Sequence, residues 1–143
     1  MKAVNTYLNF QGNTEDAFNF YKSVFGGDFS MLARFKGTPG CENIPADEAD
    51  KIMHIALPLA NGTILMGTDA LQSMGQQLII GDNVSISIHA ESREETDNLY
   101  TGLASGGKAT MPPADMPWGD YWGLLTDKFG IQWMVSYTAN PPQ

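Results

Sequence analysis

Residues 7–28 read YLNFQGNTEDAFNFYKSVFGGD and contain one complete passage from a strand to a helix. The alternation of apolar and polar residues over 3–10 predicts a β-strand. Asn13 or Thr14 then offers a cap for a helix whose first turn carries two acids. Apolar side chains recur at helical spacing until Gly26, a residue type that favours the left-handed end of a helix. The stretch therefore predicts a strand, a tight turn and an amphipathic helix.

Three further strands are predicted downstream of this helix. Residues 28–37 have the composition of a second strand, and 38–50 form a loop rich in acids and proline. Residues 51–69 contain two apolar runs around Asn61-Gly62, a dipeptide that is a strong hairpin signal. The first half of the chain thus predicts the order strand, helix and three strands.

The same order returns in the second half. Residues 83–90 alternate as a strand, and Ser92 with Glu95 forms the S-x-x-E pattern of a helix capping box. Short strand signals follow at 108–111, 121–126 and 131–137, with 112–120 as a loop. The two helices align with an offset of 79 residues: Glu15, Asn19 and Tyr21 correspond to Glu94, Asn98 and Tyr100. We therefore predict an α+β fold of two duplicated βαβββ units.

Composition excludes several classes of function. The chain of 143 residues carries a formal net charge of −8, and its lysines are scattered, which argues against nucleic acid as a partner. No apolar run has the length of a membrane helix, so we expect no membrane partner. The single Cys41 cannot form an internal disulfide, and a cytoplasmic location is the simplest expectation.

The duplicated unit resembles the vicinal oxygen chelate superfamily, which includes glyoxalase I and extradiol dioxygenases. The chain is similar above all to the PhnB-like branch, whose members are often labelled 3-demethylubiquinone methyltransferase-like. Three stretches carry the resemblance: YLNFQGNTEDAFNFYKSVFGGD (7–28), MHIALPLANGTILMGTD (53–69) and WGDYWGLLTDKFGIQWMV (118–135). The resemblance implies one domain over 1–143, with units at about 1–69 and 84–138, a linker at about 70–83, and half-barrels around a small-molecule cavity.

Metalloenzymes of this superfamily place histidine and glutamate ligands on the first and last strands of each unit. The matching positions here are Asn5, Met66, Val84 or Ser85, and Met134. Thioethers and amides are poor ligands for the hard or borderline metals expected there. We therefore expect no metal and no cofactor. The chain also lacks the G-x-G-x-x-G turn of a doubly wound nucleotide-binding fold.

Nine residues are candidates for the lining of the cavity. They combine polar groups on predicted strands with methionines and with aromatic residues of the segment 116–133: Asn5, Tyr7, Asn9, His54, Met66, Trp118, Trp122, Gln132 and Met134. His54 is the candidate catalytic residue, as a base or a polar anchor, and the alternative is a structural histidine. His89 and Asp69 could join an unusual metal site, although an aspartate after a strand more often caps a turn.

The segment 116–133 has two parts. Asp127 and Gly130 have the spacing of a turn, and Trp133 is expected to pack beneath a helix. Trp118 lies in a proline-bounded loop that could act as a lid. Tyr121 and Trp122 point to opposite faces of their strand, so only one of them can line the cavity.

Three functions remain open from the sequence. The first is a metal-free protein that binds a small molecule. The second is an enzyme, either metal-independent or with an unusual metal site. The third is a structural or interaction protein in which a homodimer protects the sheet edges.

Overall fold

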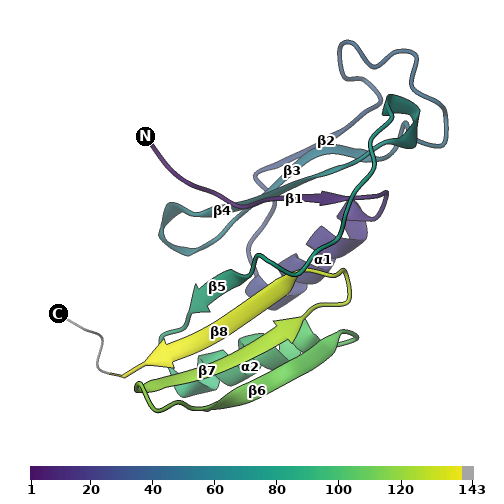
Figure 1. Cartoon of the computed structure of the whole chain (residues 1–143). Coiled ribbons are helices and arrows are strands. Elements are labelled where there is room, and N and C mark those ends of the chain that lie inside the picture. Colours follow the sequence, from purple (N-terminus) through teal and green to yellow (C-terminus); the bar gives the residue numbers. More distant parts are fainter. Residues whose placement is uncertain (140–143) are drawn as a thin grey trace. The chain divides into compact units, whose positions relative to one another are not determined.

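The computed structural model describes residues 1–139 of the chain. It divides into two compact units, the first covering Met1–Ile79 and the second beginning at Ile80. Each unit contains one α-helix and one four-stranded sheet (Figure 1). The predicted α+β class and the repeated βαβββ order are therefore confirmed. None of the helices within residues 1–139 has both the length and the apolar character required to cross a membrane.

The first unit is built on a mixed sheet with the order β1-β4-β3-β2. β1 runs parallel to β4, and the other neighbours are antiparallel. The elements are β1 (Tyr7–Phe10), α1 (Thr14–Phe25), β2 (Met31–Arg34), β3 (Ile52–Pro58) and β4 (Ile64–Asp69). A 3-10 turn, η1 (Ala60–Gly62), connects β3 to β4 at the predicted Asn-Gly site, where Asn61 adopts a φ of 57°.

The core of the first unit lies between α1 and one face of this sheet. α1 contacts β3 and β4 (Figure 1), and its buried side chains include Ala17, Phe18 and Tyr21. Gly67 of β4 allows this close packing, because a Cβ there would lie 2.6 Å from Cε1 of Phe18. The burial of alternate residues identifies the α1 side of the sheet, which carries Leu8, Phe10, Ile55, Leu57, Leu65 and Asp69.

The second unit repeats this arrangement with the strand order β5-β8-β7-β6. β5 runs parallel to β8, and the remaining pairs are antiparallel. The elements are β5 (Ile86–His89), α2 (Arg93–Ala104), β6 (Lys108–Asp115), β7 (Asp120–Thr126) and β8 (Gln132–Thr138). Along the chain, the segment that connects β4 to β5 contains one short 3-10 turn, η2 (Gln72–Met74).

Packing in the second unit places Trp133 in the core, as predicted. Its side chain is 1% exposed, and its indole N–H donates to Oδ2 of Asp127 at 2.8 Å. The same carboxylate accepts from the backbone N–H groups of Phe129 and Ile131, which closes the predicted turn. Gly130 completes this turn with a φ of 89°, a value that L side chains rarely adopt.

Several sequence-based boundaries were wrong. β6 continues through Pro112 and Pro113, where a loop was expected. An edge strand tolerates proline because it is paired on one side only, and here the two prolines lie where the register shifts between Met111 and Ala114. β1 and β2 are shorter than predicted. Ser92 caps α2 through the N–H of Glu95 as expected, but the Glu95 carboxylate bonds to the N–H of Glu91.

Candidate functional site

The face of the first sheet opposite α1, here called the first-sheet face, carries most of the predicted residues of this unit. Strand alternation places Leu8 and Phe10 toward α1, so Tyr7 and Asn9 lie on the other side. Met66 of β4 pairs in register with Tyr7 of β1 on one side and with Ala56 of β3 on the other. The first-sheet face consists of Tyr7, Asn9, His54, Ala56, Met66 and Thr68.

Tyr7 and His54 are joined on this face by a hydrogen bond. The Tyr7 hydroxyl lies 3.0 Å from Nδ1 of His54, and the ring centroids are 5.6 Å apart. The contact spans β4, which lies between the strands that carry the two residues. Tyr7 remains 43% exposed. The face therefore presents a linked phenol and imidazole beside Met66, with Ala56 of the same face buried at 6% exposure.

Asn5, which was predicted to line the cavity, also has a structural contact. It precedes β1, and its side-chain oxygen accepts a hydrogen bond of 3.0 Å from the backbone N–H of Ile64 at the start of β4. Its amide therefore links the N-terminal segment to β4. Asn9 is exposed and pairs in register with Thr68, whose hydroxyl donates to the carbonyl of Met53 at 2.7 Å.

Asp69 is a structural residue and is not available as a cation ligand. Its side chain lies on the α1 side of the sheet, opposite His54, and the residue is 2% exposed. Oδ1 accepts from the N–H groups of Gly12 and Thr14 and, at 2.6 Å, from the Thr14 hydroxyl. Oδ2 accepts from the N–H of Ile52 at 2.8 Å. The carboxylate caps α1 from a distant strand, which corrects the expected local turn cap.

Asn13 is the N-cap residue of α1, but its side chain makes no capping hydrogen bond. The cap therefore comes from Asp69, 55 positions later than Thr14 in the chain. A helix start needs acceptors for its free N–H groups, and any nearby acceptor can satisfy them. The local prediction found the correct position of the cap but not the side chain that makes the bond.

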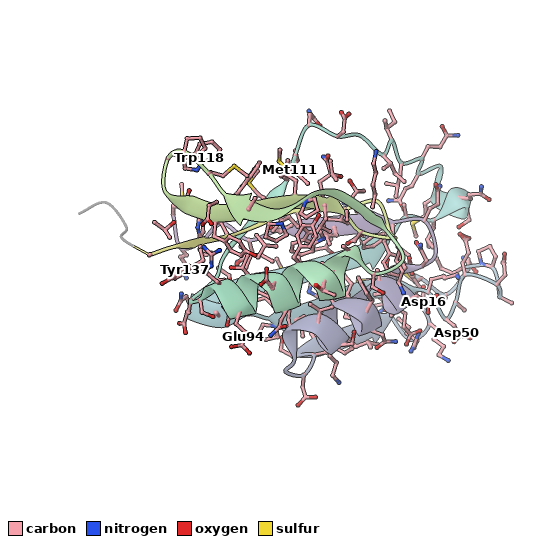
Figure 2. All side chains as sticks on the ribbon, turned by 90° about the horizontal axis from the view of Figure 1, so that it is seen from below. Asp16, Asp50, Glu94, Met111, Trp118 and Tyr137 are labelled. Carbon is pink, nitrogen blue, oxygen red and sulfur yellow. The ribbon has the colours of Figure 1, made fainter. Side chains whose placement is uncertain are left out.

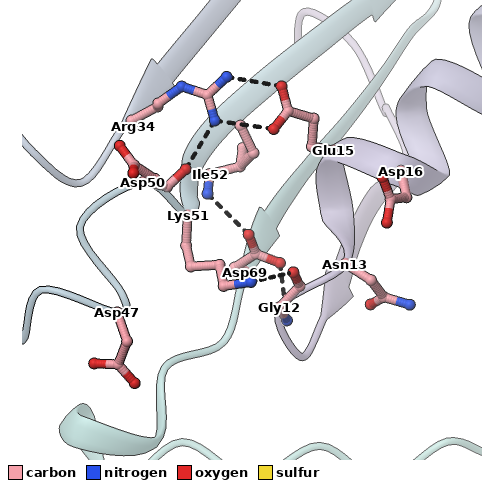
Figure 3. A pocket seen from close by; sticks show the side chains of 10 residues that line it. All are labelled: Gly12, Asn13, Glu15, Asp16, Arg34, Asp47, Asp50, Lys51, Ile52 and Asp69. Carbon is pink, nitrogen blue, oxygen red and sulfur yellow. Dashed lines mark hydrogen bonds and ion pairs between the residues drawn. The ribbon is translucent and has the colours of Figure 1, made fainter.

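A pocket of about 260 Å³ opens beside the start of α1 (Figure 3). Arg34 and Glu15 form a paired hydrogen bond across it, with distances of 3.0 and 2.7 Å. The Arg34 guanidinium lowers the pKa of the Glu15 carboxyl. Lys51 donates to the carbonyl of Gly12 at 2.9 Å. The lining consists of Gly12, Asn13, Glu15, Asp16, Arg34, Asp47, Asp50, Lys51, Ile52 and Asp69.

These contacts connect the acid-rich loop 38–50 and its flanks to α1. Arg34 also donates to the carbonyl of Asp50, and the Asp50 carboxylate pairs with Lys36 at 2.5 Å. The pKa of Asp50 is lowered by its bond with Lys36. Sequence reasoning did not identify this pocket; the only local signals were the acids in the first helical turn and in the loop. Its charged groups largely satisfy one another, so we regard it as part of the scaffold.

The face of the second sheet opposite α2, here called the second-sheet face, contains the remaining predicted residues on strands. Tyr121 donates its hydroxyl to Asp97 of α2 at 2.6 Å, so Trp122 lies on the side away from the helix. Gln132 uses its amide to donate to the carbonyl of Val84. The second-sheet face includes Ser87, His89, Trp122, Leu124, Gln132, Met134 and Ser136.

Trp118 and Trp122 lie together at one end of β7. Their ring centroids are 6.1 Å apart and the rings meet at 69°, an edge-to-face arrangement. The Trp118 indole N–H donates to Oδ2 of Asp120 at 2.9 Å, and Thr138 donates its hydroxyl to Oδ1. Trp118 is nevertheless 64% exposed.

The metal site of the superfamily does not fit the residues at hand. Within either unit, residues 1–139 bring together no three His, Cys, Asp or Glu side chains that could hold a metal ion. The amide oxygen of Asn5 already accepts a backbone hydrogen bond, and Asp69 faces the helix. Met66 and Met134 offer only thioethers, which are weak donors to such ions.

Comparison with known proteins first establishes the class. The fold is that of the glyoxalase-type proteins: a glyoxalase-related enzyme from Fulvimarina pelagi shares it with a TM-score of 0.60 and 18% identity, covering 96% of this chain and 89% of that chain. The chain belongs to the 3-demethylubiquinone-9 3-methyltransferase family, whose model matches residues 2–136.

Two solved structures resemble the chain more strongly. Protein PA1353 from Pseudomonas aeruginosa has a TM-score of 0.84 and 33% identity, covering 96% of this chain and 98% of that chain. The PhnB protein from Bacillus cereus has a TM-score of 0.77 and 28% identity, covering 96% and 100% of the two chains. The resemblance to PhnB-like and glyoxalase-type proteins that the sequence indicated is therefore confirmed.

Proposed function

We propose that the protein binds a small organic molecule on the first-sheet face. The observation that carries the proposal is the hydrogen bond between Tyr7 and His54, formed on a sheet face that also carries Met66 and Ala56. Ligand sites combine an apolar surface with a few fixed polar groups. The likeness to a protein described as a glyoxalase-related enzyme gives further support at the level of the fold.

The chemistry of this face suits a ligand with an apolar body and one group that can form hydrogen bonds. The Tyr7 hydroxyl can both donate and accept, and the imidazole of His54 retains its second nitrogen for a ligand. Met66 is flexible and can adjust to the shape of an apolar partner. The mutual hydrogen bond holds both rings in place, which lowers the entropic cost of binding.

A thermal-unfolding screen of small organic molecules tests this proposal, followed by calorimetry on Tyr7→Phe and His54→Ala. A ligand present at about 100 times its Kd stabilises the native state by roughly 2.7 kcal/mol. We expect each variant to lose about 3- to 10-fold in affinity, the value of one hydrogen bond. Tyr137→Phe is the matched control, because it removes a tyrosine hydroxyl from β8, which contributes no residue to the first-sheet face. Equal affinity in all variants, or no stabilising compound, contradicts the proposal.

A second candidate function is proton transfer, and the same pair of residues favours it. A histidine fixed by a phenol has the arrangement of a general base with an orienting partner. Once a ligand is found, NMR in D₂O tests whether an acidic C–H of the ligand exchanges faster with the protein than without it. His54→Gln should abolish the exchange while binding persists. If the ligand binds but its C–H does not exchange, proton transfer is rejected and the binding function stays.

The homodimer expected from the sequence stays a proposal. β2 and β6 are edge strands of their sheets, and the segment between the sheets exposes Ile79 and Ile80 at 97% and 76%. Exposed apolar residues and open sheet edges each favour association with a second copy. Light scattering at micromolar concentration tests this, and a monomer contradicts it.

A further inference from the structure

Trp118, Trp122 and Asp120 lie together at one end of the second sheet. Trp118 is exposed over most of its surface, yet its ring makes two specific contacts. One edge bonds to the Asp120 carboxylate, and the ring packs edge-to-face with Trp122. These three residues are here called the aromatic corner. Figure 2 shows Trp118 beyond the strands of the second sheet on the side away from α2.

The backbone also fixes the aromatic corner. The N–H of Met116 donates to the carbonyl of Asp120 at 2.8 Å, and the N–H of Gly119 donates to the carbonyl of Met116 at 3.0 Å. Gly119 adopts a φ of 104°, which L side chains rarely adopt. Pro117 restricts the chain just before Trp118. A site that is ordered before binding loses little entropy when it takes a ligand.

The electrostatics of the aromatic corner favour a cation. The faces of indole rings carry negative partial charge and attract cations, and tryptophan is the strongest of the aromatic residues in this respect. Asp120 adds a formal negative charge, and among the described residues each of its carboxylate oxygens accepts one side-chain hydrogen bond, which leaves acceptor capacity for a ligand. The corner therefore combines two indoles at a steep angle with a carboxylate.

No lysine or arginine of the second unit neutralises this carboxylate among the described residues. Arg93 pairs with Asp115 and lies over the ring of Tyr121, on the α2 side of β7. Lys108 pairs in register with Thr126, at the opposite end of β7 from Asp120. Six residues of extended strand separate those ends by about 20 Å. His89 is the one histidine on the second-sheet face. It pairs in register with Ser136 of β8, which in turn pairs with Trp122 of β7, so one strand separates His89 from Trp122.

From these contacts we propose that the aromatic corner binds an alkylated ammonium group. A quaternary or tertiary ammonium ion has an apolar surface that packs against both indoles, and its charge is balanced by Asp120. A primary ammonium group is more strongly hydrated and suits this site less well. The proposal does not depend on the first-sheet face, because the two sites share no residue.

Indole N–H signals in NMR spectra of the full chain provide the test, with choline as the probe. The protein has three tryptophans, and Trp133 is buried and bonded to Asp127, so its signal serves as an internal reference. We expect choline to shift the signals of Trp118 and Trp122 in a saturable way and to leave Trp133 unchanged. The matched control ligand is 3,3-dimethyl-1-butanol, a neutral compound of nearly the same shape.

Choline should bind about 5-fold or more tightly than the neutral compound, the size of one partly desolvated cation–π contact. Trp118→Ala should remove the choline-dependent shift of Trp122, and Trp118→Phe should retain part of it. Equal binding of the two compounds identifies an apolar patch without selectivity for a cation and overturns the proposal. The absence of any saturable shift up to about 100 mM choline overturns it as well, since an exposed cation–π site should respond in this range.

Discussion

The hydroxyl of Tyr7 lies 3.0 Å from Nδ1 of His54, although 47 positions and an intervening strand separate the two residues. The parallel pairing of β1 with β4 brings Tyr7 beside Met66, and the antiparallel pairing of β4 with β3 brings His54 within reach. Both residues were candidates from the sequence, but their bond was not predicted.

A double-mutant cycle measures the strength of this bond. We expect Tyr7→Phe, His54→Ala and the double variant to give a coupling of about 0.5–1.5 kcal/mol in the free energy of unfolding, the net value of a hydrogen bond. Chemical denaturation of the four proteins provides the data. A cycle between Tyr7→Phe and Asp16→Asn is the control and should be additive, because Asp16 is exposed on α1, on the opposite side of the sheet from Tyr7. Additivity between Tyr7 and His54 contradicts the assigned contact.

The replacement Asp69→Asn should cost about 2–4 kcal/mol in the free energy of unfolding. The amide keeps one acceptor and places an NH₂ group against backbone donors in a buried site. Asp47→Asn is the matched control, because Asp47 is exposed in the same unit. We expect it to change stability by less than about 0.5 kcal/mol. If the two variants are equally stable, Asp69 does not cap α1.

The replacement Gly67→Ala should destabilise the first unit by about 1–3 kcal/mol, the usual cost of overpacking. The new methyl group would lie 2.6 Å from Phe18 and 3.2 Å from the carbonyl of Leu8. Gly81→Ala serves as the control, since its Cβ would meet only Asn83 at 3.7 Å. The α1 amides should exchange their hydrogens faster in this variant, which would show the loss of stability locally. Unchanged protection in Gly67→Ala contradicts the packing of α1 on β4.

The pair Glu15–Arg34 should make stability depend on pH. Arg34 lowers the pKa of Glu15 in the folded chain, so the folded carboxylate gives up its proton more readily than the unfolded one. The stabilisation is therefore fully present above the ordinary glutamate value of about 4.3 and is lost as the pH falls through the lowered folded value. Both side chains are partly exposed, Arg34 at 29% and Glu15 at 44%. We therefore expect the ion pair to contribute no more than about 1 kcal/mol to the free energy of unfolding.

Denaturation of Glu15→Gln and wild type at pH 7 and pH 3 tests this dependence. The variant should be less stable at pH 7, and the difference should shrink at pH 3, where the wild-type carboxyl takes up a proton. Asp16→Asn controls for the change of charge, because Asp16 is exposed in the same helical turn. A difference of the same size at both pH values contradicts the role of the ion pair.

Local patterns in the sequence were sufficient for the helices, the hairpin and the duplication. The apolar period of α1, the Asn61-Gly62 turn and the Ser92 cap depend on residues close together in the chain, and all three are present in the structure. The burial of Trp133 also followed from alternation along one strand. The glycine and aspartate of the final turn were predicted for the same reason.

Long-range pairing determined the features that no local pattern predicts. Asp69 caps a helix 55 positions earlier, and Arg34 reaches Glu15 only because β2 lies near the start of α1. β6 could extend through its prolines only because it became an edge strand.

By itself, then, the sequence determined the elements, their repetition and the set of polar and aromatic residues available for a site, because these depend on periodicity and side-chain chemistry. Only the tertiary structure decided which of those side chains meet. Strand order and register bring Tyr7 to His54 and turn Asp69 toward the helix, because side chains on a strand alternate between two faces and a partner in contact can lie anywhere along the chain.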